Sequence, residues 1–225
     1  MLDETSLAAT LDAVNEALFD GRALPQRQRQ TLAGWLAARC GQPGSYEFMP
    51  APTPKDLATR PLLFTGEPLT TRAGTACKLG NEGCRALILL DVKTRAVSDA
   101  LQQAEAHMTA RLDPADGPRG GYYCCGSCTV AFWRHLLAGG LDHQEQRLAS
   151  GLEHLQRARR GKGAWRFFPS WYTVLALTET DPARARDELL YGAPRLERAL
   201  QRAPAPDNIY GLRRHEIARR ALALI

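Results

Sequence analysis

Apolar residues recur at helical spacing from the start of the chain. Between positions 5 and 19 they lie three or four residues apart, at Leu7, Leu11, Val14 and Leu18. This spacing places them on one face of an α-helix. Gly21 follows the pattern, and Pro25 is suited to the first turn of a second helix that ends near Gly41. The sequence therefore predicts an N-terminal helix pair over residues 1–41.

The next segment, residues 42–70, breaks this pattern. It contains six prolines and little periodicity. Only residues 54–59 suggest a helical turn. Its apolar residues, such as Met49 and Phe64, indicate that it packs on the rest of the domain. We therefore expect a long, ordered, proline-rich loop.

From residue 71 onward the pattern is helical almost throughout. No stretch alternates apolar and polar residues for long enough to predict a strand. The sequence predicts helices over residues 71–79, 82–90, 94–112, 127–138, 142–159, 171–178, 182–201 and 210–224. The expected fold class is all-α.

A repeat runs through this helical region. Leu89, Leu90, Leu101 and Met108 each have an apolar counterpart 47 residues later, at Leu136, Leu137, Leu148 and Leu155. Leu189 and Leu196 follow the last two of these by 41 residues. The repeating unit is a short apolar helix followed by a longer amphipathic one. Such hairpins bury their apolar faces by stacking on one another. We therefore expect tandem antiparallel helix hairpins over residues 71–225, continuous with residues 1–70 in one domain.

Composition agrees with a folded domain. Hydrophobic residues make up 44% of the 225 residues and charged residues 24%. No apolar run is long enough for a membrane span. The acidic N-terminus does not resemble a secretory signal. We therefore expect a cytoplasmic protein whose six cysteines are reduced, bind metal or do redox work rather than form structural disulfides.

The net charge of +5 comes largely from arginine, for example in the run 157–162. Such a run can bind phosphate or nucleic acid. Here it lies where a helix should end, and cations there complement the helix dipole. No aromatic residues alternate with the charges. We therefore interpret the run as a solvated helix end and expect no nucleic-acid partner.

The candidate chemistry lies in the cysteines. Three of the six are clustered at Cys124, Cys125 and Cys128, before a predicted helix. Thiolates bind zinc tetrahedrally, and a Cys-x-x-Cys turn brings two of them to one point. Further ligands would come from Cys77 or Cys84 of the preceding repeat, or from His135. The sequence thus suggests zinc as a cofactor.

Two other interpretations of the cysteines stay open. A thiol at a helix N-terminus has a lowered pKa, so Cys128 could be a nucleophile or redox group with His135 as its base. Alternatively, cysteine is a small apolar residue that suits tight helix packing. The candidate catalytic residues are therefore Cys128 and His135.

A family resemblance supports the predicted fold. The segment Gly151-x3-Leu155-x3-Arg159-x3-Gly163-x-Trp165 resembles the QW repeat of squalene and terpenoid cyclases, with Arg159 in place of glutamine. Residues 126–133 and 167–177 are similar to inner-helix segments of protein prenyltransferase β subunits. The resemblance implies part of an α/α toroid, in which paired helices form two concentric rings. Gly126 stands where the prenyltransferases have a zinc-binding aspartate, so that zinc site is not carried over.

These observations lead to one expected function and two alternatives. We expect a prenyltransferase-like or cyclase-like helical repeat protein with a cysteine-rich concave site, binding zinc and a small or lipid-like ligand. One alternative is an enzyme acting on prenyl or terpenoid substrates. The other is a non-catalytic scaffold for a partner protein. A chain of this length is short for a closed six-hairpin ring, so a homodimer that completes the cavity is also considered.

Overall fold

The computed structural model describes residues 1–116 and 120–225, and side chains outside 113–119. Within these ranges the chain is helical and has no β-sheet, which confirms the all-α class. The helices are α1 (Leu7–Phe19), α2 (Gln26–Ala38), α3 (Pro54–Thr59), α4 (Arg72–Leu89), α5 (Arg95–Asp116), α6 (Gly126–Leu137), α7 (Gln144–Arg157), α8 (Ser170–Glu179), α9 (Pro182–Leu200) and α10 (Ile209–Leu222).

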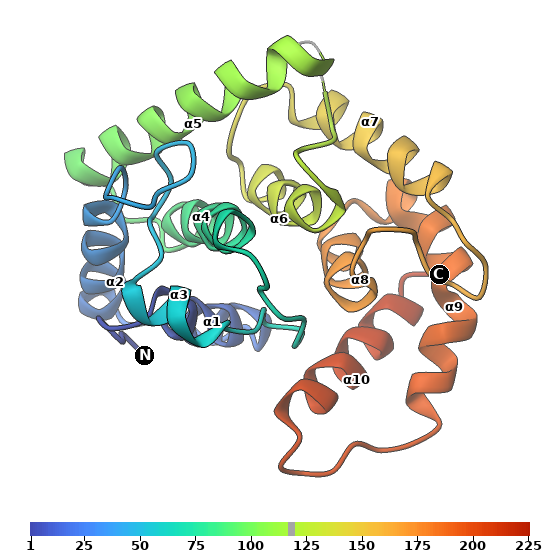
Figure 1. Ribbon diagram of the computed structural model, residues 1–225. Helices are drawn as coiled ribbons and strands as arrows, with labels where there is room; N and C mark the ends of the chain where they lie inside the picture. Colours follow the sequence, from blue (N-terminus) through green and yellow to red (C-terminus); the bar gives the residue numbers. More distant parts are fainter. Residues whose placement is uncertain (117–119) are drawn as a thin grey trace.

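The helices are arranged in two curved layers (Figure 1). Helices α2, α5, α7 and α9 follow the outside of the arc, and α4, α6 and α8 lie inside it. The inner helices pack in succession, α1 on α4, α4 on α6, α6 on α8 and α8 on α10. The short inner and longer outer helices of α6–α7 and α8–α9 match the repeating unit expected from the leucine pattern.

Helix α4 differs from the prediction. The sequence indicated two helices, over 71–79 and 82–90, but the structure has one continuous helix. Gly80 and Gly83 lie inside it because the proline-rich loop packs directly on its backbone. A Cβ added at Gly80 would lie 2.8 Å from the side chain of Met49, and one at Gly83 would lie 2.8 Å from Pro50. Tertiary packing therefore outweighs the weak helix propensity of glycine.

The proline-rich segment is ordered and includes the expected helical turn, α3. Its Asp56 is buried and accepts hydrogen bonds from the Leu7 backbone at 2.9 Å and from the Ser6 hydroxyl at 2.6 Å. Asp56 thereby satisfies free N–H groups at the start of α1, where negative charge is favourable. This contact fixes the segment to the N-terminal helix.

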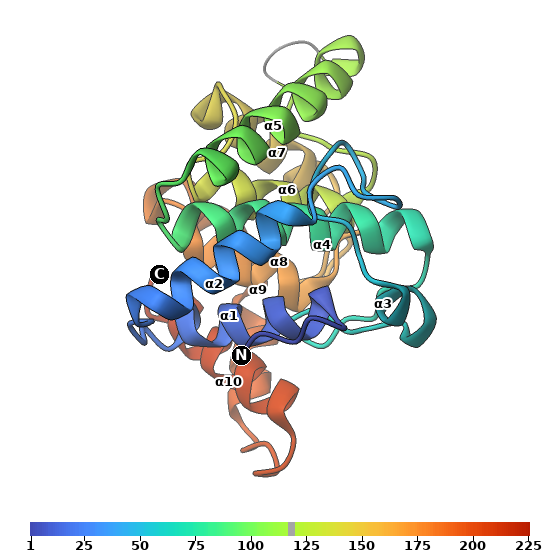
Figure 2. The ribbon, with the colours of Figure 1, turned by 90° about the vertical axis from the view of Figure 1, so that its left-hand side faces the viewer.

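Helix α10 returns to the N-terminal part of the chain. Arg213 binds both carboxylate oxygens of Asp12 in α1, at 2.7 and 2.9 Å, and stacks 4.1 Å from the Phe64 ring. Arg220 donates to the Phe19 carbonyl at 2.8 Å. The two ends of the arc are therefore joined by side chains. Figure 2 shows α10 extending below the stacked helices.

The interface between the layers is apolar. Several repeat positions noted in the sequence are fully buried: Met108, Leu136, Leu155, Leu189 and Leu196 are 0% exposed. Their burial supplies the main favourable free energy of this packing. Among the described residues, no helix is both long and apolar enough to cross a membrane.

Candidate metal centre and central polar network

Three of the predicted sulfur ligands come together. The Sγ atoms of Cys77, Cys124 and Cys128 all lie within 4.8 Å of one another. Sulfurs bound to a tetrahedral zinc ion, at about 2.3 Å each, are about 3.8 Å apart. The three thiols thus need only a small adjustment to share one ion. Cys77 and Cys128 are buried, whereas Cys124 is exposed, so the group is open to solvent on one side.

The cysteine-bearing segment is held rigidly by its neighbours. Before α6, the Gly121 carbonyl accepts a hydrogen bond from the Trp133 indole at 2.9 Å, and the Tyr123 backbone donates to Thr129 at 2.9 Å. Gly126 lies between Cys125 and Cys128 and packs closely on the backbone of Phe167. A Cβ added at Gly126 would lie 2.4 Å from the Phe167 carbonyl oxygen. These contacts fix the cysteine-bearing segment against α6 and against the loop at Phe167.

Hydrogen bonds among the three thiols shift their pKa values in different directions. Hydrogen bonds from Cys125, Cys128 and Cys77 lower the pKa of the Cys124 thiol well below its usual value. Hydrogen bonding to Cys124, followed by burial, raises the pKa of Cys77 and Cys128. The exposed Cys124 is thus the first member of the group to become a thiolate.

A buried lysine lies beside this group. Lys78 is 7% exposed, and its Nζ lies 3.4 Å from the Ser127 hydroxyl. Its charge lowers the pKa of Cys124 further, after the thiol hydrogen bonds. Among the side chains that the structure describes, no carboxylate forms an ion pair with it. Lys78 therefore provides positive charge that favours thiolates, in place of a structural salt bridge.

The other predicted ligands, Cys125, Cys84 and His135, differ in how close they lie to the three sulfurs. Cys125 is exposed, adjoins Cys124 and Cys128, and lies 3.4 Å from the Ser127 hydroxyl. Cys84 and His135 are buried elsewhere. Each is seven residues from a cluster cysteine on the same helix, which is two turns or about 10 Å along the axis. Sharing a helix face therefore does not bring Cys84 or His135 to the three sulfurs.

His135 has no catalytic partner in the described structure. It is 0% exposed, both its ring nitrogens lack a hydrogen bond among the described residues, and its ring packs against Gly140. Burial lowers its pKa to about 3. The proposed pairing of Cys128 with His135 as a base does not occur in this arrangement.

A second polar site occupies the interior of the arc. Arg134 of α6 binds both oxygens of Glu179 at 2.8 Å and also pairs with the buried Glu82. Arg85 binds Glu179 at 2.8 Å, and the Tyr172 hydroxyl donates to Glu82. Four inner helices are thus linked through two arginines and two glutamates, with Asn15 of α1 bonded to both Arg85 and Glu82.

Mutual ion pairing keeps this network charged. Burial by itself would raise the pKa of Glu179, but Arg134 and Arg85 more than compensate and lower it. Likewise, burial disfavours the charge on Arg134, but Glu179 and Glu82 raise its pKa. Glu179 and Arg134 therefore stay ionised in the interior.

One side of the network faces a cavity of about 590 Å³. Its polar lining residues are Asn15, Arg85, Arg134, Thr178, Glu179, Arg219 and Arg220. Much of its remaining wall is apolar, with Leu18, Phe19, Phe64, Leu89, Leu175, Ala223 and Leu224. The sequence analysis missed Arg134 and Glu179. The available signal for Arg134 was a charged residue between the apolar pairs Phe132–Trp133 and Leu136–Leu137.

Searches of protein-family models, curated proteins and solved structures gave no match to this chain. The resemblance to terpenoid cyclases and protein prenyltransferases therefore remains a prediction from sequence motifs. Functional inference rests on the geometry of the thiol group and of the central network.

Proposed function

We propose that the protein binds one zinc ion through Cys77, Cys124 and Cys128. The observation that supports this most directly is the mutual approach of the three sulfurs from α4 and from the start of α6. The acidified Cys124 and the unpaired charge of Lys78 add to it, because zinc binds thiolates and not thiols. The ion would join two inner helices.

The fourth position on the ion would face solvent. A zinc site with three protein ligands keeps a position for water or a substrate, whereas a fourth thiolate makes the site structural. Cys125 is exposed and adjoins the group, so a side-chain rotation is the simplest way to supply that fourth ligand. If water or a substrate occupies the fourth position, the centre is open for catalysis. If Cys125 occupies it, the centre is structural.

Metal analysis and cobalt spectroscopy test this proposal. Protein purified without added metal should contain one zinc per chain. Cobalt should replace it and give intense thiolate charge-transfer absorption, which grows with the number of bound thiolates. Cys77→Ser and Cys128→Ser should lose the metal. Cys40→Ser is the matched control, because Cys40 is partly buried outside the group. If zinc is substoichiometric and unaffected by Cys77→Ser, the proposal fails.

The pH dependence of binding provides a second test. Cys77 and Cys128 have raised pKa values, so both are protonated at neutral pH in the metal-free protein. Zinc must displace those protons, and its affinity should therefore fall as pH falls. Calorimetry in buffers of different ionisation enthalpy should show about two protons released per zinc bound. No proton release would contradict thiol ligation.

The same sulfurs suit a redox role as a second candidate. Their close approach also permits a disulfide after modest movement. Mass spectrometry of alkylated protein, before and after mild oxidation, separates the two. A reversible disulfide in protein that never carries zinc would favour the redox role.

The central cavity is suited to a small amphipathic ligand. Binding of such a ligand is the second part of the function expected from the sequence. The polar lining of the cavity includes Glu179, whose side chain is 25% exposed, and its walls are largely apolar. Such a combination of apolar walls with a few fixed polar groups is typical of small-molecule sites. A fluorescent apolar probe should bind there in competition with lipid-like compounds. Leu175→Arg should abolish binding, while Leu190→Arg, at an exposed position on α9, should not.

A further inference from the structure

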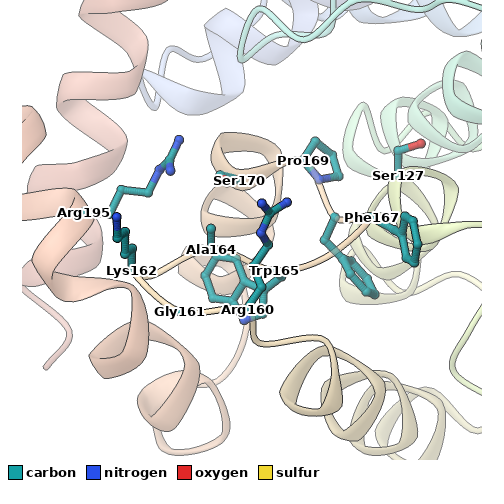
Figure 3. A pocket seen from close by; sticks show the side chains of 11 residues that line it. Ser127, Arg160, Gly161, Lys162, Ala164, Trp165, Phe167, Pro169, Ser170 and Arg195 are labelled. Carbon is teal, nitrogen blue, oxygen red and sulfur yellow. The ribbon is translucent and has the colours of Figure 1, made fainter.

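A larger cavity lies beside the thiol group. It measures about 960 Å³ and lies where the first residues of α6 and α8 meet the loop before Trp165 and the outer helix α9. Figure 3 shows Arg195 and Lys162 close together on one side of it, and Phe167 and Ser127 on the other. The cavity is thus bordered by cations, hydroxyls and aromatic rings.

Three cations at this cavity have no acidic partner. Within the described parts of the chain, Arg160, Lys162 and Arg195 form no ion pair, although Arg159 nearby pairs with Glu188 at 2.8 Å. The Nε of Arg195 is also buried and has no acceptor among the described residues. A buried donor without an acceptor is costly. The cavity is therefore lined by positive charge that no described carboxylate neutralises.

The loop that carries two of these cations is fixed in place. The Trp165 indole donates to Glu188 at 2.7 Å. The Tyr191 hydroxyl accepts from the Gly161 backbone at 2.7 Å and donates to the Ala164 carbonyl at 2.9 Å. These contacts tie the loop to α9, so that Arg160 and Lys162 are presented from a supported backbone. Preorganised cations bind an anion at a lower entropic cost.

Two hydroxyls complete the polar lining. Ser127 lies in the first turn of α6, and Ser170 is the first residue of α8. Neither helix has a side-chain cap at its N-terminus. The partial positive charge at both helix starts adds to that of the three cations.

We infer that this cavity binds an organic phosphate. The phosphate group would lie between Lys162 and Arg195, with hydroxyl donors opposite. The cavity exceeds what a phosphate ion alone would fill. Phe167, which lines the cavity, is 78% exposed, and its ring offers an apolar surface for the organic part. This assignment depends on the cavity and its charges, and it holds whether or not the cysteines bind zinc.

Titration with four probes tests the ligand class. Binding to the purified protein is followed by calorimetry at fixed ionic strength, and by the change in tryptophan fluorescence, to which Trp165 in the cavity wall contributes. Phenyl phosphate should bind more tightly than inorganic phosphate, and phenol should not bind. Benzoate should bind more weakly than phenyl phosphate, because it carries less charge. Equal affinities for benzoate and phenyl phosphate would overturn the phosphate assignment.

Substitutions locate the site. Lys162→Gln and Arg195→Gln should each weaken phenyl phosphate binding by about tenfold, as expected for a lost charged hydrogen bond. Arg198→Gln is the control: it lies on α9, is exposed and does not line the cavity. Thermal unfolding of each variant verifies folding. An equal loss in Arg198→Gln would show that binding follows net charge only, and the cavity would then not be the site.

Discussion

His135 is a buried imidazole without a hydrogen-bond partner in the described structure. Burial lowers its pKa from 6.5 to about 3. The unfolded chain therefore takes up a proton as pH falls below 6.5, whereas the folded chain does not do so until about pH 3. The free energy of unfolding must decrease across this window. A residue considered for metal binding or catalysis thus makes the fold sensitive to acid.

His135→Leu should remove this sensitivity. Between pH 7 and pH 5, wild type should lose about 2 kcal/mol more unfolding free energy than the variant, because one fewer proton is linked to unfolding. Urea denaturation at both pH values measures the difference. Equal pH dependence in the two proteins would mean that His135 takes up a proton as readily in the folded chain as in the unfolded chain.

Arg134 is the other buried group with a strong expected effect. It is 2% exposed and compensates both Glu82 and Glu179. Arg134→Met should cost about 3–5 kcal/mol in urea unfolding, because the buried Glu82 would lose its ion-pair partner. Arg186→Met, an exposed change on α9, should cost less than about 0.5 kcal/mol. A loss for Arg134→Met as small as that of the control would show that water reaches Glu82.

At the scale of elements, α4 shows how packing overrides propensity. Its two interior glycines allow the proline-rich segment to lie against the helix. A helix that looks interrupted in the sequence is therefore continuous. It carries Cys77 of the thiol group and Glu82 and Arg85 of the central network.

Matched glycine substitutions test this account. Gly83→Ala should destabilise the protein by about 1–3 kcal/mol, since the new Cβ would meet the Pro50 ring. Gly34→Ala in α2 has open space around it and should stabilise by about 0.5–1 kcal/mol through helix propensity alone. Thermal and urea unfolding measure both. If both substitutions stabilise, the contact with Pro50 is not tight.

At the scale of the whole molecule, the arc is held at two places. The central network joins the inner helices, and Arg213 joins α10 to α1 across the ends. Zinc bound to the thiol group would add a third link, between α4 and α6.

Loss of Arg213 should loosen the ends of the arc and leave its middle intact. Arg213→Met removes the bonds to Asp12 and Glu16 while it keeps an apolar stem over Phe64. Hydrogen exchange should become faster in α1 and α10 and stay unchanged in α6. Arg219→Met should change neither, because Arg219 lies at the surface of the same helix and its one ion-pair partner among the described residues is Glu216. Faster exchange throughout the chain would instead indicate global destabilisation.

Local patterns in the sequence were enough for the helical class, the proline-rich loop with its turn, and most helix positions. Apolar spacing and proline act over a few residues, so they can be recognised without the fold. The clustering of Cys124, Cys125 and Cys128 was likewise visible as a sequence motif.

Only the tertiary structure decided which distant residues meet. Cys77 joins the group while Cys84 and His135 do not, because two helical turns separate each of them from it. The pairing of Arg134 with Glu82 and Glu179, and the meeting of the 160–163 loop with α9, depend on how helices stack. Local propensity determines which segments form helices. Side-chain packing between the layers determines which helix faces come into contact, and the candidate sites lie at those contacts.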